Sequence, residues 1–175
     1  MDANQQAVPA KPTGNALPEG GRVEGRKLFQ ELVPLFIEEA ARLGWNQLYW
    51  MDPDFSDWPL GDRRTYAALQ SWSRKGRRMY IHAHRFDVLM STHHRFVNWR
   101  RQWAHIVECW QCPQSDAADF PSTMYSSGWS LRRLDRGLNL CVISAIPEQL
   151  QALEELRQDW LEKSVPGFPA HVLGL

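Results

Sequence analysis

Apolar and polar positions follow two different periods along the chain, and together they predict an alternation of helices and strands. Four segments carry apolar residues at helical spacing. The first contains Pro34, which predicts a kink, and is followed by Gly44, a typical helix stop. The last begins at Pro147, a residue that favours the first turn of a helix. The predicted helices cover 28–43, 62–74, 86–103 (in two pieces) and 147–163.

Short apolar and aromatic runs between these segments predict buried strands. The last two runs flank Asp135-Arg136-Gly137, a turn sequence typical of a hairpin. The early strand–helix alternation favours parallel pairing, and the hairpin adds antiparallel strands. We therefore expect an α/β fold of three layers, with helices on both faces of a mixed, mostly parallel sheet. The strands are expected at 47–51, 78–84, 105–110, 129–134 and 138–143.

The length of 175 residues suits one domain with an ordinary core. Residues 1–22 are rich in Ala, Pro, Gly and Gln and predict a disordered tail, 23–165 the domain, and 166–175 a C-terminal tail. The first residues lack the apolar run of a signal peptide, and no stretch is apolar enough to span a membrane. We therefore expect a cytoplasmic protein without membrane contact, whose three cysteines are reduced.

The net charge and the tryptophan content indicate which kinds of binding partner the chain favours. Twenty Lys and Arg balance twenty Asp and Glu, so the whole chain has no net attraction for nucleic acid or an anionic membrane. Binding of either kind would need a local patch. The nine tryptophans predict an aromatic core, with any exposed ones available for a protein contact.

Cys109 and Cys112 form a C-x-x-C pair with two alternative explanations. With His84 they could contribute to a zinc site, because strand ends in an α/β sheet often hold ligands. Redox chemistry is disfavoured, since no helix follows to activate a thiol. The simpler interpretation makes Cys109 a small buried apolar residue and the histidines hydrogen-bonded polar groups. Other histidines available as ligands are His82, His93, His94 and His105.

The acidic loop after the first predicted strand also has two interpretations. Asp52, Asp54 and Asp57 could bind Mg²⁺ or act as an acid and a base. Asp and Pro also build turns and cap helices, and this second interpretation explains the same residue types without a ligand.

A basic aromatic helix is the third candidate site. Arg95, Arg100 and Arg101 could bind phosphates, while Phe96 and Trp99 have the spacing of a core face. This pattern offers nucleic-acid or phosphate-ligand binding as an alternative function. The sequence holds no glycine-rich nucleotide loop and no common hydrolase motif.

The layout resembles one half of a phospholipase D-like protein, in particular short bacterial members of that superfamily. The likeness rests on the string from Leu48 to Phe55, the string from Arg78 to His84, the late hairpin, and the closing Asp159-Trp160-Leu161-Glu162-Lys163-Ser164. It covers about residues 24–165.

The resemblance implies a hairpin motif, His-x-Lys-x4-Asp, whose His attacks phosphorus and whose Lys neutralises phosphate. Asp135 matches the acid, but Gly128 stands at the His position and Ser130 at the Lys position. Neither can perform the chemistry. We therefore expect a non-catalytic binding or regulatory domain, with no required cofactor and with a homodimer or another protein as partner.

Overall fold

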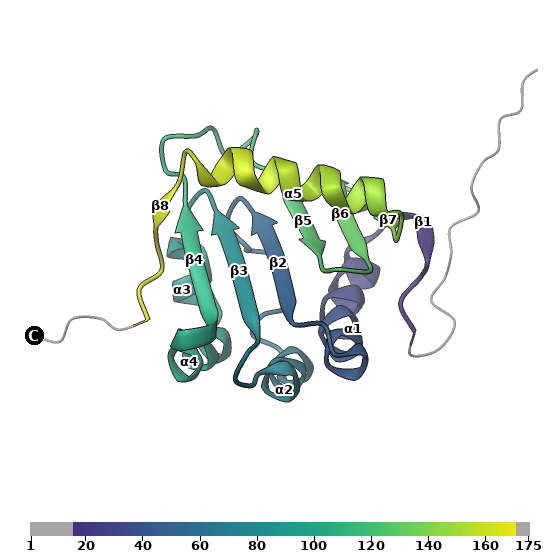
Figure 1. Ribbon diagram of the computed structural model, residues 1–175. Coiled ribbons are helices and arrows are strands. Elements are labelled where there is room, and N and C mark those ends of the chain that lie inside the picture. The colour runs from purple at the N-terminus through teal and green to yellow at the C-terminus, as the bar shows by residue number, and fades with distance from the viewer. Residues whose placement is uncertain (1–15, 171–175) are drawn as a thin grey trace, which may run out of the picture.

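The computed structural model describes residues 16–170, which fold around one eight-stranded sheet (Figure 1). The order across the sheet is β1-β7-β6-β5-β2-β3-β4-β8. The strands are β1 (Gly20–Val23), β2 (Gln47–Asp52), β3 (Arg78–Ala83), β4 (Val107–Gln111), β5 (Ser122–Tyr125), β6 (Ser130–Asp135), β7 (Leu140–Ser144) and β8 (Val165–Pro166).

The sheet is mixed, as predicted, but it is largely antiparallel rather than mostly parallel. Only β2–β3 and β3–β4 pair in parallel, and the other neighbours in the sheet run antiparallel. The expectation erred because it lacked three short strands, β1, β5 and β8, each of which adds antiparallel pairing. Two of them contain Gly or Pro, residues that weaken a strand signal in the sequence.

Five α-helices accompany the sheet, and the four predicted helical segments are confirmed with shifted ends. The segment 86–103 is divided at His93, as expected. Pro34 is accommodated inside the first helix. Within residues 16–170, none of the helices combines the length and apolar character that crossing a membrane requires. The helices are α1 (Arg26–Leu43), α2 (Arg63–Trp72), α3 (Asp87–Thr92), α4 (His94–Gln102) and α5 (Pro147–Leu161), with a 3-10 turn η1 (Ala104–Ile106).

Helices lie on both faces of the sheet. Alternate residues of β2, such as Leu48 and Trp50, join the large apolar cluster that α1, α2 and α4 complete. Helix α5 crosses the opposite face of the sheet (Figure 1). On this face Arg157 lies over the rings of Tyr49 and Tyr80. Because side chains alternate along a strand, each strand of β2–β4 serves both faces.

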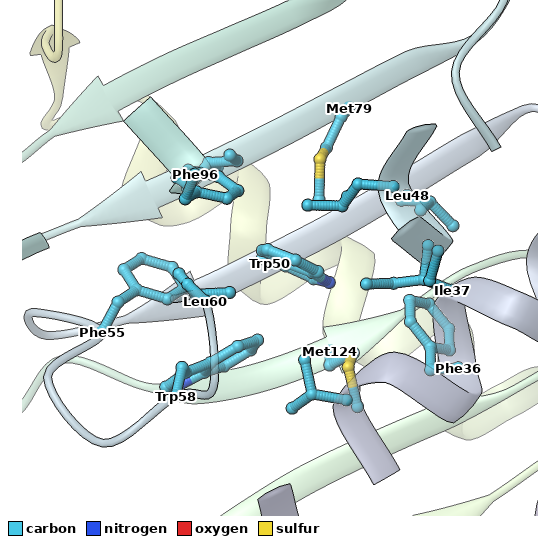
Figure 2. Packing of buried hydrophobic residues seen from close by; sticks show 14 of the residues in the cluster. Phe36, Ile37, Leu48, Trp50, Phe55, Trp58, Leu60, Met79, Phe96 and Met124 are labelled. Carbon is cyan, nitrogen blue, oxygen red and sulfur yellow. The ribbon is translucent and has the colours of Figure 1, made fainter. Parts of the chain in front are cut away.

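Trp50 lies at the centre of the main core, surrounded by side chains from helices, strands and the acidic loop (Figure 2). Its ring centroid is 5.1 Å from that of Trp58 and 6.1 Å from that of Phe96. Five tryptophans are buried, four are half-buried and none is exposed. The prediction of an aromatic core is confirmed, and no exposed tryptophan is available as a contact.

The ordered domain extends beyond the predicted limits of 23 and 165. The first three residues of β1, 20–22, fall in the segment 1–22 for which the sequence predicts disorder, and the Trp129 indole donates a 2.7 Å hydrogen bond to the carbonyl of Pro18. At the other end, Phe168 is 3% exposed and stacks against Phe86. The expected tail at 166–175 therefore begins as part of the core. Residues 1–15 and 171–175, which hold the rest of the two predicted tails, lie outside the described residues.

Candidate functional site

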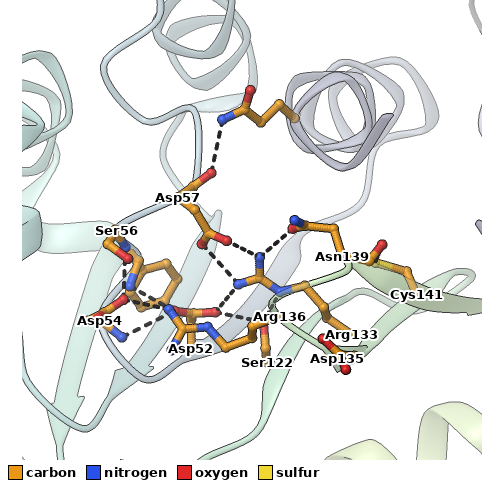
Figure 3. A network of polar contacts seen from close by, with 12 residues as sticks. Asp52, Asp54, Ser56, Asp57, Ser122, Arg133, Asp135, Arg136, Asn139 and Cys141 are labelled. Atoms are coloured by element: carbon orange, nitrogen blue, oxygen red, sulfur yellow. Dashed lines mark hydrogen bonds and ion pairs between the residues drawn. The ribbon is translucent and has the colours of Figure 1, made fainter. Parts of the chain in front are cut away.

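The acidic loop that follows β2 is built around a buried arginine (Figure 3). Arg133 on β6 donates to Asp52 at 2.6 Å and to both carboxylate oxygens of Asp57, at 2.5 and 3.1 Å. Ser122 and Asn139 accept its remaining hydrogen bonds, and the ring of Phe29 lies 4.2 Å from the guanidinium carbon. This arginine is fully satisfied by the protein itself, so the network joins β2 to the β6–β7 hairpin.

Asp52 and Asp54 act as turn-forming residues in the same loop. Asp52 accepts the backbone N–H groups of Asp54 and Phe55, and Asp54 accepts that of Ser56. Partial burial alone would raise the pKa of Asp54, but the hydrogen bonds from Ser56 and the nearby Arg136 guanidinium lower it. Turn chemistry and ion pairing therefore account for these carboxylates.

No group of three or more His, Cys, Asp or Glu side chains placed to hold a metal ion occurs between residues 16 and 170. Cys109 belongs to the main core on the α1–α4 side, and burial raises the pKa of its thiol to about 11. Cys112 packs instead with Met51 and Phe120, and its Sγ donates to the carbonyl of Lys163. The two sulfurs therefore lie in different apolar clusters and do not fit a shared zinc site.

Two of the candidate histidines are hydrogen-bonded polar groups, in line with the simpler interpretation. The His84 Nδ1 atom lies 3.0 Å from both the carbonyl of Cys112 and the hydroxyl of Ser115. His93 Nε2 lies 3.0 Å from the carbonyl of Phe55. His82 differs, since its Nδ1 is buried with no partner in the described part of the chain. Burial, reinforced by the charge of Arg157, lowers the pKa of His82 to about 3.

The basic helix separates its three candidate arginines. Arg95 and Arg101 are exposed on α4, whereas Arg100 is buried with 7% of its surface exposed. Arg100 follows Phe96 by four residues and therefore shares the core face of the helix. That spacing was available in the sequence and removes Arg100 from any solvent-facing site.

Helices α2 and α4 contact each other near both of their ends. Near their first turns, the side chain of Arg95 donates to the carbonyl of Gly61 at 2.5 Å. Near their last turns, Gln70 donates to Gln102 at 2.7 Å, and the Trp99 indole donates to Ser73 at 2.9 Å. These contacts place α2 and α4 next to each other, and both helices carry exposed cations.

We call this region the basic surface and define it by five exposed cations on α2, α4 and the loop after α2. None of the five forms an ion pair with a described residue, whereas nearby Arg64 pairs with Glu38 at 2.8 Å. The members are Arg63, Arg74, Lys75, Arg95 and Arg101.

Sequence reasoning offered Arg95 and Arg101 of this surface as a candidate site but did not join them to the cations of α2 and the following loop, because it weighed the charge of the whole chain. Between residues 63 and 107 the only acidic residue is Asp87, so the zero net charge conceals a strongly basic central segment. A running charge count along the chain would have revealed it. The Arg and Lys residues of the segment are Arg63, Arg64, Arg74, Lys75, Arg77, Arg78, Arg85, Arg95, Arg100 and Arg101.

The hairpin that carries the phospholipase D resemblance holds neither His nor Lys at the motif positions. The Ser130 hydroxyl donates to the carbonyl of Ser144, and Asp135 accepts the N–H of Leu138 in the turn. Gly128 lies against the ring of Trp45. These residues therefore serve the strand pairing and the turn.

Comparison with known proteins bears on the fold alone. No protein-family model matches the chain, and no curated protein matches it. Among solved structures the fold is similar to that of TrmBL2, described as an archaeal chromatin protein that shows a novel mode of DNA binding. The TM-score is 0.60 at 15% sequence identity, and the match covers 84% of this chain. This chain spans about half, 53%, of that protein.

Proposed function

We propose that this chain is a non-catalytic domain that binds the phosphate backbone of nucleic acid through its basic surface. The observation that carries the proposal is the set of five exposed cations without acidic partners on two adjacent helices and the loop after the first of them. Lys and Arg side chains of this kind neutralise phosphates and release counterions, which makes binding independent of base sequence. The similar fold of a DNA-binding chromatin protein supports the proposal as an analogy.

The non-catalytic part of the proposal is supported by the hairpin. We propose that the domain is a relative of phospholipase D-like halves in which the hairpin became structural, since glycine and serine stand where the motif needs His and Lys. Hydrolysis of bis-p-nitrophenyl phosphate tests this point. Turnover that disappears when one of the six histidines is replaced would contradict it.

A homodimer is proposed as the arrangement of the domain. Strands β1 and β8 form the two edges of the sheet, and edge strands are the usual place for pairing between copies. No tryptophan is exposed, so the contact would use backbone groups and exposed apolar side chains such as Leu138 and Ile146. Sedimentation that gives the mass of a single chain at all concentrations would rule this arrangement out.

Binding of a fluorescently labelled DNA duplex, followed by anisotropy, tests the nucleic-acid proposal. If all five cations contact phosphates, affinity should fall roughly 100- to 1,000-fold between about 50 and 200 mM salt. The double variant Arg74→Glu with Arg101→Glu should weaken binding strongly and flatten the salt dependence.

A matched pair of charge reversals controls for net charge. Arg26→Glu with Lys27→Glu changes the net charge by the same amount, on exposed residues of α1. This control should bind nearly as well as the unaltered protein. Equal losses in the two double variants, or no binding at about 50 mM salt, would overturn the proposal.

A further inference from the structure

A cleft of about 770 Å³ opens beneath α5, where β2 begins and β5 ends. It is walled by the turn after α1, the turn after β5, and the side of α5 that carries Gln151 and Glu154. The size is within the range of small-molecule sites. It shares no residue with the basic surface, so a function here goes beyond nucleic-acid binding.

The charges around the cleft favour an uncharged occupant. Among residues 16–170, Glu154 is the only charged residue that lines it. Its carboxylate already accepts hydrogen bonds from Tyr125 at 2.6 Å, from Gln158 at 2.9 Å, and from Arg157 at 2.6 and 2.9 Å. An anionic ligand would meet a carboxylate without a lining cation, and a cationic ligand would compete with a partner that is already bound.

Neutral polar groups in the cleft are left free for a ligand. The side chains of Asn46 and Ser127 are exposed and form no hydrogen bond with the described part of the chain. The Gln151 amide donates to Glu155, and its carbonyl oxygen accepts no bond from residues 16–170. Together they offer donors and acceptors that match hydroxyl groups.

An aromatic wall stands beside these groups. The half-buried ring of Trp45 packs against Phe36, with centroids 5.9 Å apart. A Cβ at position 128 would lie 3.2 Å from that ring, so Gly128 provides the space that the indole occupies. Tyr49 also lines the cleft, but Tyr125 at 4.7 Å and Tyr80 at 5.1 Å cover the two faces of its ring, so the free ring face is that of Trp45. A flat or apolar ring face gains contact area on such a wall.

From these observations we propose that the cleft binds an uncharged ring compound that carries hydroxyl groups, either a sugar or the ribose and base of a nucleoside. The aromatic wall contacts the ring, and Asn46, Ser127 and Gln151 bind its hydroxyls.

The indole N–H signals in a ¹⁵N NMR spectrum provide the test, because Trp45 is the only tryptophan that lines the cleft. The Trp45→Phe variant assigns its signal. Glucose and adenosine are the neutral probes, and glucose 6-phosphate and AMP are their charged counterparts. We expect at least one neutral probe to shift the Trp45 signal with a Kd of about 1 mM or tighter. Its phosphorylated counterpart should bind roughly tenfold more weakly.

The double variant Asn46→Ala with Gln151→Ala should weaken the response of the Trp45 signal. The control Gln149→Ala alters an exposed residue of α5 outside the cleft. This control should leave the response of the Trp45 signal unchanged. A response to glucose alone identifies a sugar site, and a response to adenosine alone a nucleoside site. No response to either probe, or tighter binding of the phosphorylated compounds at the Trp45 signal, would overturn the proposal. Reading the signal of Trp45 keeps this result separate from any binding of AMP at the basic surface.

Discussion

The guanidinium of Arg133 lies 2.6 Å from the carboxylate of Asp52, and both side chains are fully buried. The contact joins the end of β2 to β6, two strands that β5 separates in the sheet. A buried ion pair contributes little when compared with apolar residues of the same shape, but breaking it leaves an uncompensated charge in the core.

Replacing Arg133 by alanine should therefore destabilise the fold by about 3–5 kcal/mol. The matched variant is Arg136→Ala, which removes a partly exposed arginine that pairs with Asp54 at 2.8 Å and lies farther from Asp52, at 3.7 Å. Exposed pairs contribute about 0–1 kcal/mol, so this change should be small. Urea unfolding of the two variants measures the difference. Similar losses in both would mean that the buried network is not the main link between the strands.

Acid stability should depend on His82. Burial and the charge of Arg157 lower its pKa to about 3, below the ordinary value of 6.5 that applies in the unfolded chain. The unfolded chain binds the proton first as the pH falls, so stability is lost progressively from about pH 6.5 towards pH 3, by up to about 1.4 kcal/mol per pH unit. Unfolding free energies measured at several pH values should show this slope.

The variant His82→Gln should flatten the slope between pH 6.5 and 5, because glutamine does not titrate. His94→Gln is the control, since His94 is exposed on α4. An unchanged slope in His82→Gln would show that another group governs the loss of stability in acid.

Two buried tryptophans differ in their indole hydrogen bonds. The N–H of Trp129 donates to Pro18, whereas that of Trp58 has no partner among the described residues. Substitution of either by phenylalanine removes a similar volume from the core, so the cavity cost is comparable. Trp129→Phe should cost about 1 kcal/mol more than Trp58→Phe, because it leaves the buried carbonyl of Pro18 without its donor. Denaturant unfolding of both variants provides the comparison, and the reverse order would contradict this account.

Helical spacing predicted the long elements because each one buries a continuous apolar face. The pattern from Leu28 to Leu43 gave α1 to within two residues. Strand β5 was missed because its four residues follow Pro121 at the end of a polar stretch and are held by β2 and β6 on either side. Tertiary pairing of this kind leaves no periodic signal in a short segment.

The candidate sites were harder to predict, since residue type does not reveal a partner that is distant in the chain. Asp52 looked available for a metal, but its partner Arg133 lies 81 residues away. Cys109 and Cys112 looked paired, yet they belong to separate apolar clusters. The basic surface could have been predicted from local charge, because the acids are nearly absent over a long central segment.

Arg100 and Arg101 are adjacent on α4, but substitution by methionine should affect DNA binding at only one of them. Arg100 is buried, and its Nε and one terminal nitrogen have no hydrogen-bond partner among residues 16–170. Its guanidinium carbon lies 5.8 Å from the ring centroid of Phe168. Methionine fills much of the same space without the cost of unpaired donors, so Arg100→Met should leave stability unchanged or raise it by about 1 kcal/mol.

Comparison of Arg100→Met with Arg101→Met tests which of the two arginines contacts the DNA duplex. Arg101 is exposed, so Arg101→Met should leave stability within about 0.5 kcal/mol of the unaltered protein but reduce the affinity for the DNA duplex and its salt dependence. Arg100→Met should leave both binding quantities unchanged, because a buried guanidinium releases no counterion. Anisotropy titrations of the two variants at two salt concentrations measure this contrast. A larger loss of binding in Arg100→Met would mean that α4 moves on contact with DNA and exposes the face that now packs against Phe168.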